Sequence, residues 1–401
     1  ADSVLATLQK GADPKRGKNV FATMSIVKDW SAPDDSTVTI NFKAPVPERQ
    51  MLDLLQFLIP IDPKGIDTVE TVPAGTGPYT LVNRAVGQSL TLKANPKYWR
   101  EKQPIVQDLV FTVFSEDASA SAALESGAVD IVYNGSSRSA VRLKNAGFQV
   151  FAGPGPLVQV FRINSTRGPF RNKAFRQAFN HLMDRASILR VGYAGMGKVV
   201  ALPWAPASPA YDESYNATYA YDLEKAKKLI AASGLSADEI KNWKLLVNGS
   251  DEPSVAISQI VQGSLQKIGI PVELDMRQGA EYVTALLGGD FAATFGAVGN
   301  IQKFPSRVAT NSIYRTSGNP VLKDPHPHPD YVAAIARVDA TSGGAAEVKA
   351  AYDNLNKVLV EEAFGIPTNS YDVGLIVASD KIGGVTLDMD NLFIARTIGF
   401  K

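Results

Sequence analysis

Hydrophobic and polar residues alternate along several short runs of this chain, and a period of two predicts half-buried strands. The clearest case lies between Val72 and Trp99, where the runs 79–81 and 90–92 alternate leucine or tyrosine with polar residues. A turn at residues 86–88 joins the two runs, and the prolines and glycines at 73–78 predict a rigid loop before them. The segment therefore predicts a β-hairpin, with Trp99 as an aromatic anchor at its end.

Other segments carry apolar residues at the helical spacing of three to four. The longest such face predicts one large helix over residues 170–189, and Asp222 predicts a cap for the helix at 223–232. Strands and helices alternate along the chain, and this succession is typical of mixed α/β sheets rather than of a helix bundle. Strands are predicted at 37–42, 108–114, 129–133, 158–164, 243–248, 270–276 and 291–298, and further helices at 118–125, 254–268, 282–287 and 348–362.

Length and composition narrow the class of protein. A chain of 401 residues with 45% hydrophobic content is too long for one ordinary domain, so we expect two lobes. The formal net charge of +1 gives no reason to expect binding to nucleic acid or to an anionic membrane. The chain has no cysteine, which excludes disulfides and thiol chemistry, and it has no apolar run of the roughly 18 residues that a membrane span needs.

Three candidate chemical motifs are weak. Residues 192–198 fit G-x-x-x-x-G-K, but Val199 replaces the Ser or Thr of a phosphate-binding loop and a helix precedes the motif. His326 and His328 alternate with prolines in residues 324–330, where a third convergent metal ligand is missing, so a solvated loop is expected. His181 is interpreted as a residue at the edge of the core, and no G-x-S-x-G motif is present. We therefore expect neither an enzyme nor a metal or other cofactor.

Four segments, in order, resemble one known family. They are G-T-G-P-Y with N-P-K-Y-W in residues 75–99, A-A-L-E-S-G-A-V-D at 122–130, P-F-R-N-K-A-F-R-Q-A-F with M-D-R at 169–185, and Y-D-L-E-K-A-K-K-L-I at 221–230. Together they are similar to the dipeptide- and oligopeptide-binding proteins, the large periplasmic receptors of ABC importers (solute-binding protein family five, the peptide and nickel class). The resemblance extends over nearly the whole chain.

This resemblance implies a two-lobed periplasmic-binding-protein fold of mixed α/β sheets with a hinge (type II, cluster C-like). It implies an exported, periplasmic monomer that closes on a peptide-like or other small organic solute and delivers it to an ABC permease and its ATPase. The signal sequence is expected upstream of this chain, and residue 1 is expected to lie inside the first lobe. The expected division is 1–72, a remainder of the N-terminal lobe; 73–168, the first lobe; 169–371, the second lobe; and 372–401, a return to the first lobe.

The Gly/Ala-rich segment at 291–305 is the main candidate for ligand contact, because small residues let a backbone approach a ligand closely. It matches the family motif G-W-x-x-D-x-x-x-P, but Val298 stands in place of the Trp and Ile301 in place of the Asp that pairs with a peptide ammonium. An ammonium in a closed cleft would then lack its carboxylate, so a non-standard solute, such as a modified peptide or an opine-like or sugar-linked compound, is favoured over simple peptides. The candidate ligand-binding residues are Asn134, Ser136, Arg138, Trp204, Arg277, Ala297, Val298, Gly299, Asn300, Gln302 and Tyr371.

Three alternatives remain open. Nickel-type relatives of the family bind metal through an organic chelator, so a metal-chelate or haem carrier is one. The other two reuse the fold without transport, as a signalling receptor or as a hydrolase.

Overall fold

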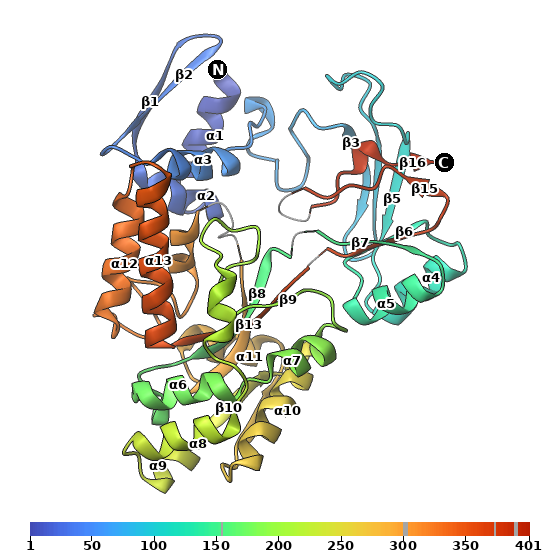
Figure 1. Ribbon diagram of the computed structural model, residues 1–401. Helices are drawn as coiled ribbons and strands as arrows, with labels where there is room; N and C mark the ends of the chain where they lie inside the picture. The colour runs from blue at the N-terminus through green and yellow to red at the C-terminus, as the bar shows by residue number, and fades with distance from the viewer. Residues whose placement is uncertain (154, 300–303, 373, 389–391) are drawn as a thin grey trace.

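The computed structural model describes residues 1–153, 155–299, 304–372, 374–388 and 392–401. Its described part forms a large body built on a six-stranded sheet and a smaller body built on short antiparallel sheets, which lie side by side (Figure 1). This mixed α/β, two-lobed architecture is the one expected from the sequence. We call the two bodies the large lobe and the small lobe.

The large lobe is organised around a sheet of order β11-β10-β12-β8-β13-β9. Strands β10 to β12 run parallel, whereas β8 and β13 are antiparallel to their neighbours. The central strand β8 is buried along most of its length, in keeping with its mainly apolar sequence. The strands are β8 (Leu157–Ile163), β9 (Lys198–Val199), β10 (Lys244–Asn248), β11 (Glu273–Arg277), β12 (Ala293–Val298) and β13 (Gly365–Tyr371).

Helices cover both faces of this sheet (Figure 1). On one face Phe161 stacks on Phe179 at a centroid distance of 5.0 Å within an aromatic cluster that includes Phe170 and Trp243. On the other face Trp204, Tyr314 and Phe364 are fully buried. The helices are α6 (Lys173–Leu182), α7 (Arg185–Gly192), α8 (Leu223–Ala232), α9 (Ala237–Lys241), α10 (Glu252–Lys267), α11 (Gly279–Gly288), α12 (Pro329–Ala340) and α13 (Ala345–Glu362).

The small lobe contains the predicted hairpin, β3 paired with β4, and a third strand β5 beside it. A second antiparallel sheet has the order β6-β14-β7, and α4 and α5 pack near it. The elements are β3 (Tyr79–Ala85), β4 (Ser89–Ala94), β5 (Asp108–Thr112), α4 (Asp117–Glu125), β6 (Ile131–Tyr133), α5 (Ser137–Asn145), β7 (Gln149–Phe151), β14 (Ile376–Ala378), β15 (Ile382–Gly383) and β16 (Gly399–Phe400).

The N-terminal segment forms its own small core around Leu8 and Leu54, above α12 and α13 in Figure 1. The strand β1, which pairs with β2 in an antiparallel hairpin, was not among the strands predicted from the sequence. The elements are α1 (Asp2–Ala12), α2 (Lys18–Thr23), β1 (Val27–Asp34), β2 (Thr37–Phe42) and α3 (Glu48–Phe57).

Three sequence predictions were wrong. The expected helix 170–189 is a 3₁₀ turn followed by α6 and α7, because Asn172 caps α6 and Asp184 caps α7. Trp99 is 68% exposed, and its ring contacts among the described residues are with its chain neighbours Tyr98 and Arg100, so it does not anchor the hairpin in a core. The expected solvated loop 324–330 is folded into the large lobe, where His326 and His328 are buried against Phe364.

The chain crosses between the lobes at two places, between β7 and β8 and between β13 and β14. Since β8 lies in the six-stranded sheet, the first crossing falls at residues 152–156, before the expected boundary at 168–169. We therefore propose residues 152–156 and 372–375 as the lobe boundaries. None of the helices in the described part of the chain combines the length and the hydropathy of a membrane span.

Candidate functional site

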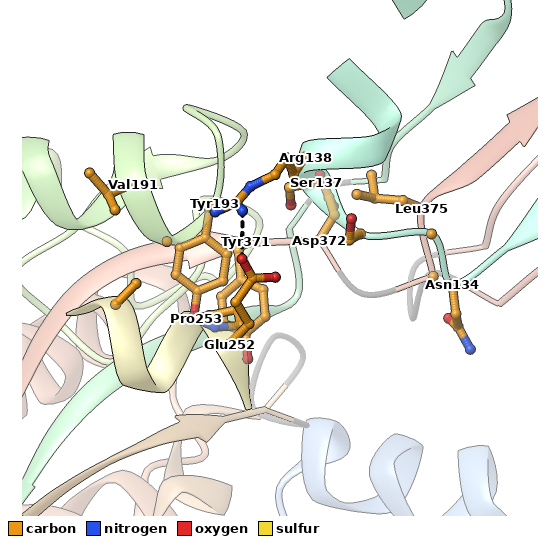
Figure 2. Close-up of a pocket in the computed structure, with 15 residues that line it drawn as sticks. Asn134, Ser137, Arg138, Val191, Tyr193, Glu252, Pro253, Tyr371, Asp372 and Leu375 are labelled. Atoms are coloured by element: carbon orange, nitrogen blue, oxygen red, sulfur yellow. Dashed lines mark ion pairs between the residues drawn. The ribbon is translucent and has the colours of Figure 1, made fainter. Parts of the chain in front are cut away.

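A cavity of about 420 Å³ lies where the two lobes meet (Figure 2). The small lobe contributes the end of β6 and the start of α5, and the large lobe contributes the end of α7 and the start of α10. Residues 371–372 and 374–375, at the second crossing, also line it. The lining residues fall in the segments 134–138, 191–193, 252–256, 371–372 and 374–375.

An ion pair spans the mouth of this cavity between the lobes. Arg138 of α5 places Nη1 2.5 Å from Oε1 of Glu252 in the first turn of α10, and Figure 2 shows the pair as a dashed line. The side chains are 67% and 70% exposed, so the pair contributes little to stability. It nevertheless places a cation and an anion beside any molecule that enters the cavity.

The start of α5 is held rigidly by Asp117. Its carboxylate accepts hydrogen bonds from the backbone N–H and hydroxyl of Ser136 and from the hydroxyl of Ser139. Burial raises the pKa of Asp117, but these hydrogen bonds outweigh burial and lower the pKa overall. Ser136 also caps α5, because its hydroxyl oxygen accepts a hydrogen bond from the Ser139 N–H. This hydroxyl is therefore already hydrogen-bonded within the protein.

Two tyrosines form the large-lobe wall of the cavity. The rings of Tyr193 and Tyr371 pack with their centroids 4.5 Å apart. The buried Tyr193 hydroxyl donates to Gln159 Oε1 at 2.9 Å, and burial raises the pKa of Tyr371 to about 12. Both phenols are therefore neutral at physiological pH, and they present aromatic surface with fixed orientation.

The two crossings are joined beside the cavity. The Gly155 N–H donates to Asp372 Oδ1 at 2.7 Å, and Gly155 has a φ of +65° that a glycine adopts without strain. This bond connects the first crossing to the second.

The structure brings together four of the candidate residues predicted from sequence. Asn134, Ser136, Arg138 and Tyr371 all line the cavity. Asn134 has a φ of +63°, which turns the chain sharply between β6 and α5.

Two others lie elsewhere. Trp204 is fully buried in the large-lobe core, where its Nε1 donates to Asn356 Oδ1 at 2.6 Å. Arg277 pairs with Asp275 at 2.7 Å and with Asp290 at 3.5 Å, and it lies on β11 at the edge of the six-stranded sheet.

The structure describes only part of the Gly/Ala-rich segment 291–305. Ala297 and Val298 end β12, and Val298 is fully buried in the core rather than facing a ligand. Gly299 lies against Leu157, since a Cβ there would sit 2.3 Å from Leu157 Cδ2. Asn300 and Gln302 lie outside the described residues.

Sequence reasoning missed Tyr193, Glu252 and Asp372, which also line the cavity. Tyr193 lies inside the phosphate-loop-like motif, Glu252 opens a predicted helix, and Asp372 follows a candidate tyrosine. Nothing in the local sequence shows that these residues lie near the other lobe. Only the tertiary structure places the three residues together.

The buried histidines form a different constellation. Ser165 Oγ lies 2.8 Å from His328 Nε2, and His328 Nδ1 lies 2.7 Å from Glu362 Oε2. This is the order of contacts in a Ser-His-acid triad. However, Ser165 is only 6% exposed, Glu362 also pairs with Lys173 and Arg176, and burial lowers the pKa of His328 to about 4.

None of these three residues lines either of the two cavities described here. The constellation is therefore interpreted as a buried clamp that holds the 324–330 loop against the end of α13. Among the described residues, no group of three or more His, Cys, Asp or Glu side chains could hold a metal ion.

A second cavity, of about 850 Å³, lies within the small lobe between β5, β6 and the C-terminal strands. It is bounded by one lobe only. The cavity between the lobes is the one that would change shape if the lobes moved, and it is therefore the candidate functional site.

Comparison with known proteins identifies the family. The family model for bacterial extracellular solute-binding proteins, family 5 Middle, matches residues 1–319. Heme-binding protein A of Haemophilus influenzae is 26% identical over 230 residues, which are 57% of this chain and 42% of that protein. The dipeptide-binding protein of Pseudomonas aeruginosa is 25% identical over 232 residues, 57% of this chain and 43% of that protein.

Among solved structures, NikA from Brucella suis in complex with Fe(III)-EDTA aligns with a TM-score of 0.84 at 22% identity, over 100% of this chain and 84% of NikA. This likeness concerns the fold. The chain spans less than half the length of the two curated relatives. The family model covers most of the chain, and the chain therefore belongs to family 5 of the bacterial extracellular solute-binding proteins.

Proposed function

We propose that this chain is the extracytoplasmic solute-binding component of an ABC importer, and that it holds a small organic solute in the cavity between its lobes. The supporting observation is that both lobes and the second crossing line one cavity, with the Arg138–Glu252 ion pair at its mouth. A ligand that touches both lobes stabilises the closed arrangement, because only there does it make both sets of contacts.

The lining favours a solute with polar and apolar parts. Arg138 offers a planar fork of donors for a carboxylate, and Glu252 offers an acceptor for a cationic or hydroxyl group. The paired rings of Tyr193 and Tyr371 offer apolar surface for a hydrocarbon or sugar face. A modified peptide or an opine-like or sugar-linked compound meets these requirements, and Ile301 at the position of the family's peptide-binding Asp argues against simple peptides.

The partners follow from the family. We propose a periplasmic location and delivery of the solute to an ABC permease with its ATPase, which would recognise the closed lobes. The relatives of this chain include ABC transporter peptide-binding proteins, which agrees with this role. We expect the chain to bind the solute without converting it.

Native mass spectrometry of the purified protein tests the function directly. A discrete mass increment that is released by denaturation and identified as a small organic molecule is the expected result. The matched variants are Arg138→Gln, which removes a lining charge, and Arg277→Gln, which removes an arginine outside the cavity. The increment should fall in the first variant and persist in the second.

Two results would contradict the proposal. An increment that is lost equally in both variants would place the solute elsewhere, and tight binding of several unmodified peptides of differing sequence would refute the preference for a non-standard solute. A porphyrin or a metal chelate in the released fraction would instead support the carrier alternative, since the relatives include a heme-binding protein.

A further inference from the structure

The ion pair at the mouth of the cavity between the lobes can open at little cost. The side chains of Arg138 and Glu252 are both largely exposed, so water competes with the attraction between them. Neither residue depends on the other for the fold of its own lobe, because each lies in the first turn of a different helix. A solute that offers Glu252 another cation can therefore take the place of the Arg138 guanidinium.

The position beside Glu252 already holds a guanidinium in this structure. Arg138 Nη1 lies 2.5 Å from Glu252 Oε1, within the distance of a charge-assisted hydrogen bond. Both residues line the cavity of about 420 Å³, together with Tyr193 and Tyr371 (Figure 2). The space next to Glu252 is thus open to a solute, and its carboxylate is shown to accept from a guanidinium.

The charges that line this cavity are not balanced. Among its described lining residues Arg138 is the one base, whereas Glu252 and Asp372 are both acidic. One positive and two negative side chains leave a surplus of one negative charge at neutral pH. A solute with a net positive charge complements this lining.

Asp251, the cap of α10, adds a negative charge near the tyrosine wall. Burial raises the pKa of Tyr371 to about 12, and the charge of Asp251 acts in the same direction, whereas Arg162 on β8 acts in the opposite one. Asp251 and Arg162 offset each other in sign, so the surplus negative charge of the lining remains.

The two tyrosine rings suit a flat cation. The rings of Tyr193 and Tyr371 pack with their centroids 4.5 Å apart, and both phenols are neutral at physiological pH. The face of an aromatic ring attracts a cation, and a guanidinium can stack on it because the group is planar. An ammonium has no such flat face. The lining therefore favours a guanidinium over an ammonium.

We infer that the solute carries a guanidinium and a carboxylate, and that it inserts into the ion pair between the lobes. The guanidinium of the solute takes the place of Arg138 beside Glu252, and the released Arg138 binds the carboxylate of the solute. The direct contact between α5 and α10 becomes a contact through the solute, so both lobes hold it. This inference rests on the proposed function, because it names the class of solute that the same cavity takes.

Arginine is the probe for this inference, and citrulline is its matched control, because a neutral ureido group replaces the guanidinium in citrulline. Lysine supplies an ammonium instead, and agmatine is arginine without its carboxylate. Protein stripped by unfolding and refolding is titrated with each compound at constant ionic strength, and the heat of binding and the melting temperature are followed. Arginine should bind saturably, citrulline at least tenfold more weakly, and lysine several-fold more weakly.

Variants separate the roles of the two charges. Glu252→Gln should weaken the binding of arginine and of agmatine at least tenfold, whereas Asp290→Asn, which removes a carboxylate outside the cavity, should change neither. Arg138→Gln should weaken arginine binding, because the carboxylate of arginine loses its partner. The same variant should strengthen agmatine binding several-fold, because the competing guanidinium of the protein is gone.

The inference is overturned if stripped protein shows no saturable arginine binding, or if citrulline or lysine binds as tightly as arginine. It is also overturned if Glu252→Gln binds arginine like the parent protein, or if Arg138→Gln shifts arginine and agmatine binding in the same direction. The proposed function is tested separately by mass spectrometry. A released solute that depends on Arg138 and has no guanidinium would support the cavity as the site and overturn only the class of solute.

Discussion

Arg138 Nη1 lies 2.5 Å from Glu252 Oε1, and these two residues belong to different lobes. Their side chains are largely exposed, so either substitution Arg138→Gln or Glu252→Gln should change the free energy of unfolding by less than about 1 kcal/mol. The distance between the lobes should increase, because the attraction between the two charges acts between α5 of one lobe and α10 of the other. We expect each variant to shift the lobes toward larger separations.

Spin labels can measure this shift, since the chain has no cysteine. Exposed Lys144 on α5 and Lys267 at the end of α10 can be changed to Cys and labelled without side reactions. The charge-swapped double variant, Arg138→Glu with Glu252→Arg, should restore the parent distance distribution. Identical distributions in the parent and both single variants would refute a role of the pair in lobe closure.

Trp204 should matter for stability and leave solute binding unchanged. Trp204→Phe removes the donor to Asn356 Oδ1 and leaves this buried acceptor unpaired, at a cost of about 1–3 kcal/mol. Trp99→Phe, at an exposed position, should cost less than about 0.5 kcal/mol. Urea unfolding measures both, and a loss of solute binding in Trp204→Phe with unchanged stability would contradict the assignment to the core.

The glycines of the phosphate-loop-like motif serve the fold. Gly197 has a φ of +120°, and a Cβ there would lie 2.1 Å from the carbonyl oxygen of Ser370 on β13. Gly195 has a φ of +78° with open space around it. We expect Gly195→Ala to cost about 1 kcal/mol and Gly197→Ala about 3 kcal/mol or more, because the second also pushes β9 from β13. Equal costs in urea unfolding would show that the steric contact is unimportant.

His328 should make stability depend on pH. Burial, with the Arg176 guanidinium acting in the same direction, lowers its pKa to about 4, whereas an unfolded histidine has a pKa near 6.5. Between these values the unfolded state binds more protons, so the stabilising contribution is complete above about pH 6.5 and is lost as the pH falls toward 4.

Chemical unfolding at pH 7 and pH 5 measures this contribution above the range where most carboxylates titrate. The parent protein should lose about 2 kcal/mol more than His328→Gln between these two pH values. His181 and His326 remain in the variant and provide the internal comparison. A pH dependence that is unchanged in His328→Gln would mean that this histidine is not held neutral by the fold.

The secondary structure was largely readable from the sequence because local rules determine it. Asp222 caps α8 as predicted, and the β3–β4 hairpin forms around the predicted turn. The prediction of one helix at 170–189 was wrong because Asp184 caps a second helix within this range. The uninterrupted apolar face gives no sign of that break.

The site was less accessible to prediction because it is a tertiary property. Arg138 was a candidate from its place after a strand, but its partner Glu252 is 114 positions away and carries no signal of its own. His326 and His328 look like residues of a solvated loop, since nothing in the local sequence shows that Phe364 and Glu362 cover them.

Leu157 and Tyr371 are register partners on β8 and β13, although 214 positions separate them along the chain. The large lobe is thus a continuous insertion whose two ends leave side by side, and the strands β7 and β14 that it interrupts belong to one sheet. The small lobe therefore cannot complete that sheet during synthesis until the whole insertion has emerged from the ribosome. Because the two ends of the insertion already lie together, residues 157–371 should be removable. A short loop in their place should join β7 to β14, so that their sheet still forms.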